Sequence, residues 1–307
     1  MMRVPFVMRK MAFRRLASLA IIGAFGIGAA FAGSPEIIAH RGGTADAPEN
    51  TLVAIQTALD NGADAVWVTV QESKDGVIVL YRPSDLKSLT DMSGPVSAYT
   101  ASELAGTDAG WAFSHDKGQN HPFRGKGIGI PRLDAVLQAF PKTKFYIDIK
   151  SPDANPEQLG KALLATLEAS QSLDRTRVYS TDTKYLQALP SAVRRFEARD
   201  DTRTLLANVT MAHQCDLTAD NSAPRWHGLE LAREVEVVEK YTLGEGISKA
   251  ELTWDKEAMD CFRSKGAAHI ILFGINSLDD YHKAVALGAD GVMVNSPKEA
   301  KSFSGKP

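Results

Sequence analysis

Apolar residues follow two alternating patterns from Pro35 onward. Short runs rich in β-branched residues, typical of buried strands, alternate with stretches that carry apolar residues at helical spacing. The runs that predict strands are EIIAH (36–40), DAVWVTV (64–70), VIVLY (77–81), KFYIDIK (144–150), TRVYS (176–180), TLLANV (204–209), HGLELA (227–232), HIILFG (269–274) and DGVMVN (290–295). This alternation predicts an α/β fold built on a parallel sheet.

Three helices can be placed from the sequence. One spans residues 51–60 with Asn50 as its N-cap, one spans 156–169, and one spans 278–287 and ends at Gly288. Closing the sheet gives a (β/α)8 TIM-type barrel, whose active site lies at the C-terminal ends of the strands. An open, doubly wound sheet is the alternative architecture.

Residues 82–131 interrupt the alternation, because they carry Gly, Ser, Asp and His without a long apolar period. In a compact domain so long a connection is usually functional or forms an inserted subdomain. Within it, GKGIGIP (125–131) has the glycines of a phosphate-binding loop. No predicted strand precedes these glycines and no helix N-terminus directly follows them, so we interpret them as an ordinary loop.

The N-terminus predicts a secretory signal. Five basic residues precede the apolar run LASLAIIGAFGIGAAFA (16–32), which ends in the small-residue pattern Ala30-Phe31-Ala32. A membrane anchor is the alternative, but a run this short and rich in Gly and Ala is marginal for a spanning helix. We therefore expect residues 1–32 to be cleaved, leaving one domain over 33–307 in the periplasm or outside the cell, with no stable membrane span.

The net charge limits the expected partners, and the two cysteines allow one disulfide. Cleavage would remove five positive charges and change the formal net charge from −2 to −7. An acidic exported protein has no overall attraction to nucleic acid. Cys215 and Cys261 could form a disulfide in an oxidising compartment, or they could be two separate buried thiols.

Candidate chemistry begins where the first predicted strand ends, at His40. In a barrel this histidine would point into the mouth. Arg41 offers a planar set of donors suited to phosphate, and Gly42 and Gly43 allow backbone N–H groups to approach an anion closely. These residues predict a site for an anionic group.

The stretch IIAHRGGTADAPENTLVAIQTALDNGADAV (37–66) resembles the opening of the glycerophosphodiester phosphodiesterase family. Members combine an early His-Arg-Gly with Pro-Glu-Asn-Thr and a Gly-Ala-Asp before the second strand. The likeness continues through KDGVIVLY (74–81), GPVSAYTASELAGTDAG (94–110), IPRLDAVL (130–137), YIDIK (146–150) and GINSLDDYHKAVALGADGVMVNSP (274–297). It implies a TIM-type barrel with a small insertion after the second strand, and a small phosphodiester or phospholipid-derived ligand.

The chain departs from the family at the metal site and at the second catalytic histidine. The resemblance implies a Glu-x-Asp pair on the second strand, where this chain has Trp67 and Thr69. It also implies a His-Asp pair where this chain has Arg82 and Pro83. Of the family's third-strand Glu-x-Lys, the chain keeps a carboxylate and a lysine, Asp148 and Lys150.

These changes predict a site without a metal ion. Ca²⁺ and Mg²⁺ need several oxygen ligands, usually with more than one carboxylate as anchor. Asp148 alone should hold neither ion. Glu49 is a possible second ligand, but in the family pattern it belongs to the start of a helix and need not reach the metal position. We therefore expect no metal and no other cofactor.

The predicted site is cationic. We expect His40 and Arg82 to be catalytic, and Arg41, Glu49, Asp148 and Lys150 to bind the substrate phosphate. Because arginine stays charged at physiological pH, Arg82 can stabilise a phosphate but cannot replace a titrating histidine. A replacement could come from His115 or His121 in the inserted loop, and His227 is the first residue of the predicted strand HGLELA. Trp67 could stack on a ligand or pack in the core.

Three functions follow from this combination. The first is an exported phosphodiesterase that cleaves glycerophosphodiesters with a divergent, metal-free site. The second is a non-catalytic relative that binds phosphodiesters or lipid headgroups, since cations suffice for binding while turnover needs transition-state stabilisation. The third is an interaction protein whose pocket is vestigial.

Overall fold

The structure is a computed structural model that describes residues 34–217 and 223–305. The predicted signal segment, residues 1–32, lies outside the described residues. Among the helices of the described ranges, none has the length and apolar character needed to cross a membrane.

Seven parallel strands form a curled sheet in the order β5-β4-β2-β1-β10-β9-β6. Their bounds are β1 (Glu36–His40), β2 (Ala65–Glu72), β4 (Lys144–Ile149), β5 (Thr176–Ser180), β6 (Arg225–Glu230), β9 (Ala268–Phe273) and β10 (Gly291–Val294). The predicted strand at 77–81 is present as β3 (Ile78–Leu80), which pairs antiparallel with β2 and adds no strand to the ring.

An extended segment, residues 194–197, fills the gap between β5 and β6. Val178 N donates to Arg194 O, and Phe196 N donates back to Val178 O, both at 2.8 Å. On the other side, Glu197 N donates to Trp226 O at 2.8 Å. The segment therefore supplies the eighth position of the ring, which confirms the predicted (β/α)8 barrel over the open sheet.

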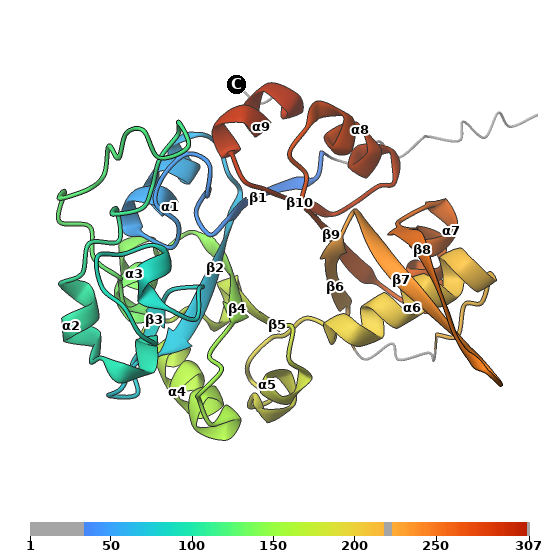
Figure 1. Cartoon of the computed structure of the whole chain (residues 1–307), viewed down its shortest axis with the longest axis horizontal. Coiled ribbons are helices and arrows are strands. Elements are labelled where there is room, and N and C mark those ends of the chain that lie inside the picture. The colour runs from blue at the N-terminus through green and yellow to red at the C-terminus, as the bar shows by residue number, and fades with distance from the viewer. Residues whose placement is uncertain (1–33, 218–222, 306–307) are drawn as a thin grey trace, which may run out of the picture. The chain divides into compact units, whose positions relative to one another are not determined.

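Helices surround the ring of strands (Figure 1). They are α1 (Leu52–Asp60), α3 (Leu133–Ala139), α4 (Pro156–Ala169), α5 (Thr183–Ala188), α6 (Arg199–Ala212), α7 (Lys256–Arg263), α8 (Leu278–Ala286) and α9 (Pro297–Ser304). The helices predicted at 156–169 and 278–287 are confirmed, the second one residue shorter.

Two local predictions are wrong. The strand expected at 204–209 is part of α6, because Thr202, Leu206 and Val209 are buried at helical spacing rather than at every second position. The N-cap of α1 is Thr51, whose hydroxyl accepts from Ala54 N, and not Asn50. Asn50 has a positive φ of 59° and points its side chain at β2.

Aromatic side chains fill the inside of the ring. Trp67 on β2 is 2% exposed, and its ring lies 5.0 Å from those of Tyr179 and Phe273. Tyr146 and Phe196 complete its surroundings. Of the two expectations for Trp67, packing is therefore the one observed, and the polar mouth of the barrel lies on a solid aromatic floor.

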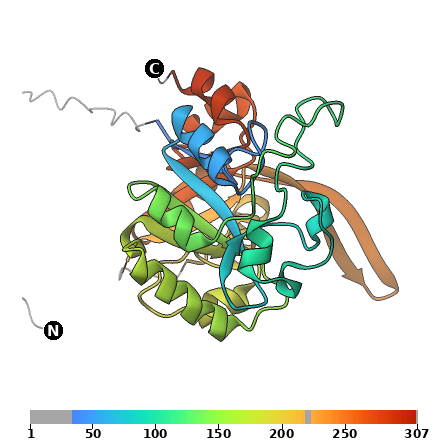
Figure 2. The ribbon, with the colours of Figure 1, turned by 90° about the vertical axis from the view of Figure 1, so that its left-hand side faces the viewer.

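Two insertions extend from the ring on the same side (Figure 2). The first follows β3 and holds the short helices η1 (Leu86–Ser88), η2 (Val96–Ala98) and α2 (Ala101–Ala105). It has its own small core, which includes Tyr81, Leu86, Val96, Leu104 and Ile130. The second, absent from the sequence prediction, is an antiparallel hairpin of β7 (Ala232–Tyr241) and β8 (Gly244–Thr253) that directly follows β6.

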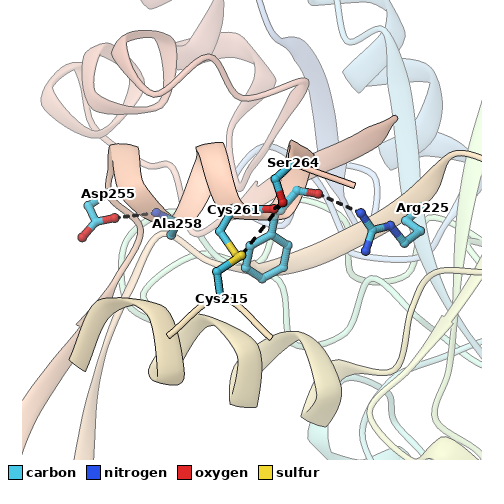
Figure 3. Close-up of a disulfide and its surroundings, with 7 residues drawn as sticks. Cys215, Arg225, Asp255, Ala258, Cys261 and Ser264 are labelled. Carbon is cyan, nitrogen blue, oxygen red and sulfur yellow. Dashed lines mark hydrogen bonds between the residues drawn. A yellow bond between two sulfur atoms is a disulfide. The ribbon is translucent and has the colours of Figure 1, made fainter. Parts of the chain in front are cut away.

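A disulfide joins Cys215 to Cys261, which agrees with the first of the two expectations for these cysteines. It links the segment after α6 to α7, as Figure 3 shows. The Cys261 end of the bond is buried in the core between the helices and the outer face of the sheet. The crosslink therefore encloses β6, the β7–β8 hairpin and most of α7 in one covalent loop.

Candidate active site

A tight turn directly after β1 directs the chain away from the sheet and leaves His40 at the mouth. Arg41, Gly42 and Gly43 all have positive φ, at 51°, 82° and 96°. A Cβ on Gly42 would lie 2.9 Å from Ala54 Cβ, so only glycine allows α1 to pack this closely. The Gly-Gly pair is thus explained by local folding.

The His40 imidazole is held in one orientation by Asn295, the residue that follows β10. Its Nδ1 lies 2.7 Å from Asn295 Oδ1, an atom that can only accept, so Nδ1 carries the proton and Nε2 is left as an acceptor. Burial and the Arg41 guanidinium lower the pKa of His40 to about 4. At neutral pH the imidazole is uncharged and its Nε2 can take a proton.

Arg41 is fixed by Glu49, the acidic residue of the Pro-Glu-Asn-Thr stretch. Arg41 Nη1 donates to both carboxylate oxygens, at 2.8 and 3.1 Å. Both side chains are mostly buried, which makes this a stronger restraint than a surface ion pair. Glu49 therefore faces Arg41 and holds its guanidinium beside His40.

Asp148 and Lys150 lie at the C-terminal end of β4, two strands away from β1. Lys150 Nζ is 3.2 Å from Asp148 Oδ1 and donates to Thr181 Oγ1 at 2.7 Å. Burial raises the pKa of Asp148 to about 6, against the opposing effect of Lys150, Arg41 and Arg82. These three cations are close enough to Asp148 to act on its charge.

Arg82 follows β3, and its side chain is exposed. Within the described ranges it forms no hydrogen bond or ion pair, yet it lowers the pKa of both His40 and Asp148. It lines a cavity of about 310 Å³ with Lys150, Ser151, Thr181 and Tyr185. Arg82 is therefore the least restrained cation of the mouth and faces solvent and any entering ligand.

Buried polar atoms gather beneath these cations without a hydrogen-bond partner. Thr69 on β2 is the register neighbour of Asp148, and its backbone N donates to Asn50 Oδ1 at 2.9 Å. The side-chain atoms that lack a partner here are Arg41 Nε, Asn50 Nδ2 and Thr69 Oγ1. Since buried polar groups are rarely left unpaired, this cluster is suited to a polar ligand. Sequence reasoning missed Asn50, Thr69 and Asn295 as contributors, although Asn295 directly follows β10, Thr69 lies on β2 and Asn50 directly precedes the N-cap of α1.

The residues at the family's metal positions do not fit a divalent cation. The Trp67 side chain is packed in the aromatic core, and Glu49 is occupied by Arg41. Asp148 is the carboxylate that remains, and it lies among three cations that would repel a metal ion. No group of three metal-ligating side chains occurs in the described part of the chain.

The other candidate histidines lie elsewhere. His121 Nδ1 is 3.1 Å from Phe113 O, and His115 packs edge-on against Phe113. His227 is buried under α6 and α7, where Nδ1 is 3.0 Å from Thr202 Oγ1 and burial lowers its pKa to about 3. Across residues 34–217 and 223–305, none of the three forms a hydrogen bond or ion pair with His40, Arg82 or Asp148.

Comparison with known proteins agrees with this fold. The model of the glycerophosphoryl diester phosphodiesterase family matches residues 40–299. The chain is 41% identical over 274 residues to the protein named "Uncharacterized protein Rv2277c" of Mycobacterium tuberculosis (strain ATCC 25618 / H37Rv), covering 88% of this chain and 89% of that protein.

Further relatives carry the activity in their names. The glycerophosphodiester phosphodiesterase of Bacillus subtilis (strain 168) is 26% identical over 263 residues, covering 85% of this chain and 83% of that protein. The crystal structure of the glycerophosphoryl diester phosphodiesterase domain of Rv2277c matches with a TM-score of 0.82 and 39% identity, covering 88% of this chain and 99% of that chain. With a matching family model over most of its length and a relative above 40% identity, this chain belongs to the glycerophosphoryl diester phosphodiesterase family.

Proposed function

We propose that this chain is an exported phosphodiesterase that hydrolyses small phosphodiesters without a metal ion. Its substrate would be a glycerophosphodiester, split into an alcohol and glycerol 3-phosphate. The observation that carries the proposal is the neutral His40 beside Arg41 and Arg82, at the end of the barrel where this fold holds its active sites. Membership of the family supports the reaction class.

The proposed chemistry divides the work between a base and a group of cations. His40 Nε2 accepts a proton from the water that attacks phosphorus. Arg41, Arg82 and Lys150 stabilise the negative charge that grows on the phosphorus oxygens in the transition state. Glu49 acts through Arg41, since both of its oxygens accept from that guanidinium.

The charge of the site supports a reaction without a metal ion. A divalent cation would neutralise a phosphodiester, and here three permanently or mostly charged side chains can do so instead. Arg82 occupies the family's histidine position and brings one of these charges. In this proposal, the loss of the family's second-strand carboxylates and the gain of Arg82 are parts of one change, in which fixed cations replace a metal ion.

The proposed location is the periplasm or the cell exterior. The signal-like pattern of residues 1–32 supports export. The Cys215–Cys261 disulfide supports an oxidising compartment, where such bonds persist. A mature chain of negative net charge favours a small phosphodiester or phospholipid-derived ligand over nucleic acid.

The test is release of choline from glycerophosphocholine by the purified protein, with added Ca²⁺ or Mg²⁺ and with chelator. We expect turnover that resists chelator and falls about 100-fold or more in His40→Ala, the range for loss of a general base. His282→Ala is the matched control, because His282 is exposed on α8 and its loss should change nothing.

Three results would overturn parts of this proposal. Turnover that chelator abolishes would contradict the metal-free site. Binding of glycerophosphocholine without turnover under any condition would instead identify a non-catalytic phosphodiester-binding protein. No binding at all would leave a vestigial pocket.

A further inference from the structure

Asp148 is out of place in a site that binds an anion. Its carboxyl group lies at the C-terminal end of β4, 7% exposed, among the cations that would hold a phosphate. A carboxylate there would repel the phosphodiester and compete for Arg41, Arg82 and Lys150. A carboxylic acid would instead donate a hydrogen bond to it.

The surroundings of Asp148 favour the neutral acid once a ligand arrives. Two cations from other elements act on its charge: Arg41, in the turn after β1, and Arg82, in the segment after β3. Its register neighbours on the adjacent strands are Thr69 on β2 and Tyr179 on β5. Lys150 approaches from its own strand. Thr69 has no charge, and burial raises the pKa of Tyr179 so that it stays neutral. Within the described residues, the cations that act on the charge of Asp148 are Lys150, Arg41 and Arg82.

We propose that Asp148 is the proton donor of this site, which takes up a proton when the phosphodiester binds and passes it to the oxygen of the leaving alcohol. The inference rests on the proposed function and assigns the acid that the family's missing histidine would otherwise supply. The Asp148 side chain is almost fully buried, and its Oδ1 lies 3.2 Å from Lys150 Nζ, which also donates to Thr181 Oγ1.

The electrostatics of the free protein agree with this role. Burial raises the pKa of Asp148 to about 6, and the three cations oppose that rise. A bound phosphodiester anion neutralises the same cations, so the force that keeps the pKa down is removed on binding. The carboxyl group then takes up a proton at neutral pH.

The step balances as an in-line displacement. A water O–H bond breaks, its proton passes to His40 Nε2, and the water oxygen forms a bond to phosphorus. The bond from phosphorus to the alcohol oxygen breaks, and that oxygen takes the proton of Asp148. The products are an alcohol, a phosphomonoester, an imidazolium and a carboxylate. The imidazolium then loses its proton to solvent, and Asp148 takes up a new proton when the next phosphodiester binds.

The first experiment measures proton uptake. Glycerophosphocholine is titrated into His40→Ala at pH 7 by calorimetry in two buffers of different ionisation enthalpy. The substitution prevents turnover and removes His40, whose imidazole could also take up a proton when the ligand binds. We expect uptake of more than about half a proton per site, and no uptake in His40→Ala/Asp148→Asn. Binding without uptake in His40→Ala would overturn this inference alone, whereas no binding would overturn the proposed function as well.

The second experiment separates an acid from a structural residue. In the otherwise native protein, Asp148→Asn should lower choline release from glycerophosphocholine about 100-fold or more. With glycerol p-nitrophenyl phosphate the loss should stay under about fivefold, because p-nitrophenolate leaves without needing a proton. An equal loss on both substrates would overturn the assignment of Asp148 as the acid. The second substrate also shows whether the variant is folded.

Discussion

At the scale of single residues, Asn295 determines which nitrogen of His40 can act. Its Oδ1 accepts from Nδ1 at 2.7 Å and so leaves Nε2 as the proton acceptor. An amide fixes the tautomer without adding charge, and burial together with the Arg41 guanidinium then holds the pKa of His40 low. A carboxylate at this position would fix the same tautomer but favour the imidazolium.

Two substitutions at Asn295 separate these effects. Asn295→Ala should lower kcat about 10-fold or more with a small change in KM, because the imidazole loses its fixed tautomer. Asn295→Asp should move the acidic limb of the kcat/KM profile to higher pH, because the added negative charge raises the pKa of His40 and the base protonates sooner as pH falls. An acidic limb at the same pH in Asn295→Asp and the native protein would refute this account.

At the scale of elements, the sequence predicted seven of the eight ring positions and missed one. The segment 194–197 reads Arg-Arg-Phe-Glu, which has no β-branched residue and no alternation, yet it forms backbone bonds to both neighbours. The β7–β8 hairpin escaped prediction although residues 234–237 of β7 read Glu-Val-Glu-Val, an alternation too short to stand out among the surrounding charged residues. A strand of four residues with a single buried apolar side chain leaves little signal in a sequence.

The residues of the site also divide into those that the sequence reveals and those that it does not. His40, Arg41, Asp148 and Lys150 could be named because they carry charge or titrate. Asn50 and Asn295 could not, since a neutral amide has no distinctive pattern and its role depends on a partner from a distant part of the chain.

The disulfide should stabilise the elements that it encloses. Cys215 and Cys261 are 46 residues apart, and a closed loop of this length is expected to contribute about 4 kcal/mol by restricting the unfolded chain. Urea denaturation of Cys215→Ser/Cys261→Ser should show a loss of about that size in the free energy of unfolding. The native protein treated with reductant should match the double variant, and equal stability with and without the bond would contradict the prediction.

At the scale of the whole molecule, the barrel is closed by a short segment that depends on one side chain. Phe196 is 1% exposed and packs inside the ring against Trp67, Tyr146 and Tyr179. Its backbone N bonds to β5, and the next residue bonds to β6. The aromatic floor beneath the site and the continuity of the ring therefore rest on the same residue.

Phe196→Ala should destabilise the protein by about 3–5 kcal/mol, because it leaves a large cavity that the surrounding rings cannot fill. The measurement is urea unfolding, with Leu243→Ala as the control. Leu243 is fully exposed at the hairpin tip, so its loss should change stability by under about 0.5 kcal/mol. A loss below about 1 kcal/mol in Phe196→Ala would mean that the ring closes without this side chain.

The base of the β7–β8 hairpin has a consequence for how this protein could have changed over time. Ala232 and Thr253 are register partners, and just below them Trp254 N donates to Leu231 O at 3.1 Å. The chain thus leaves and re-enters the barrel at one point. A single insertion or deletion in the gene could add or remove the whole hairpin without moving β6 or α7, and a foreign domain with neighbouring termini could be grafted there in its place.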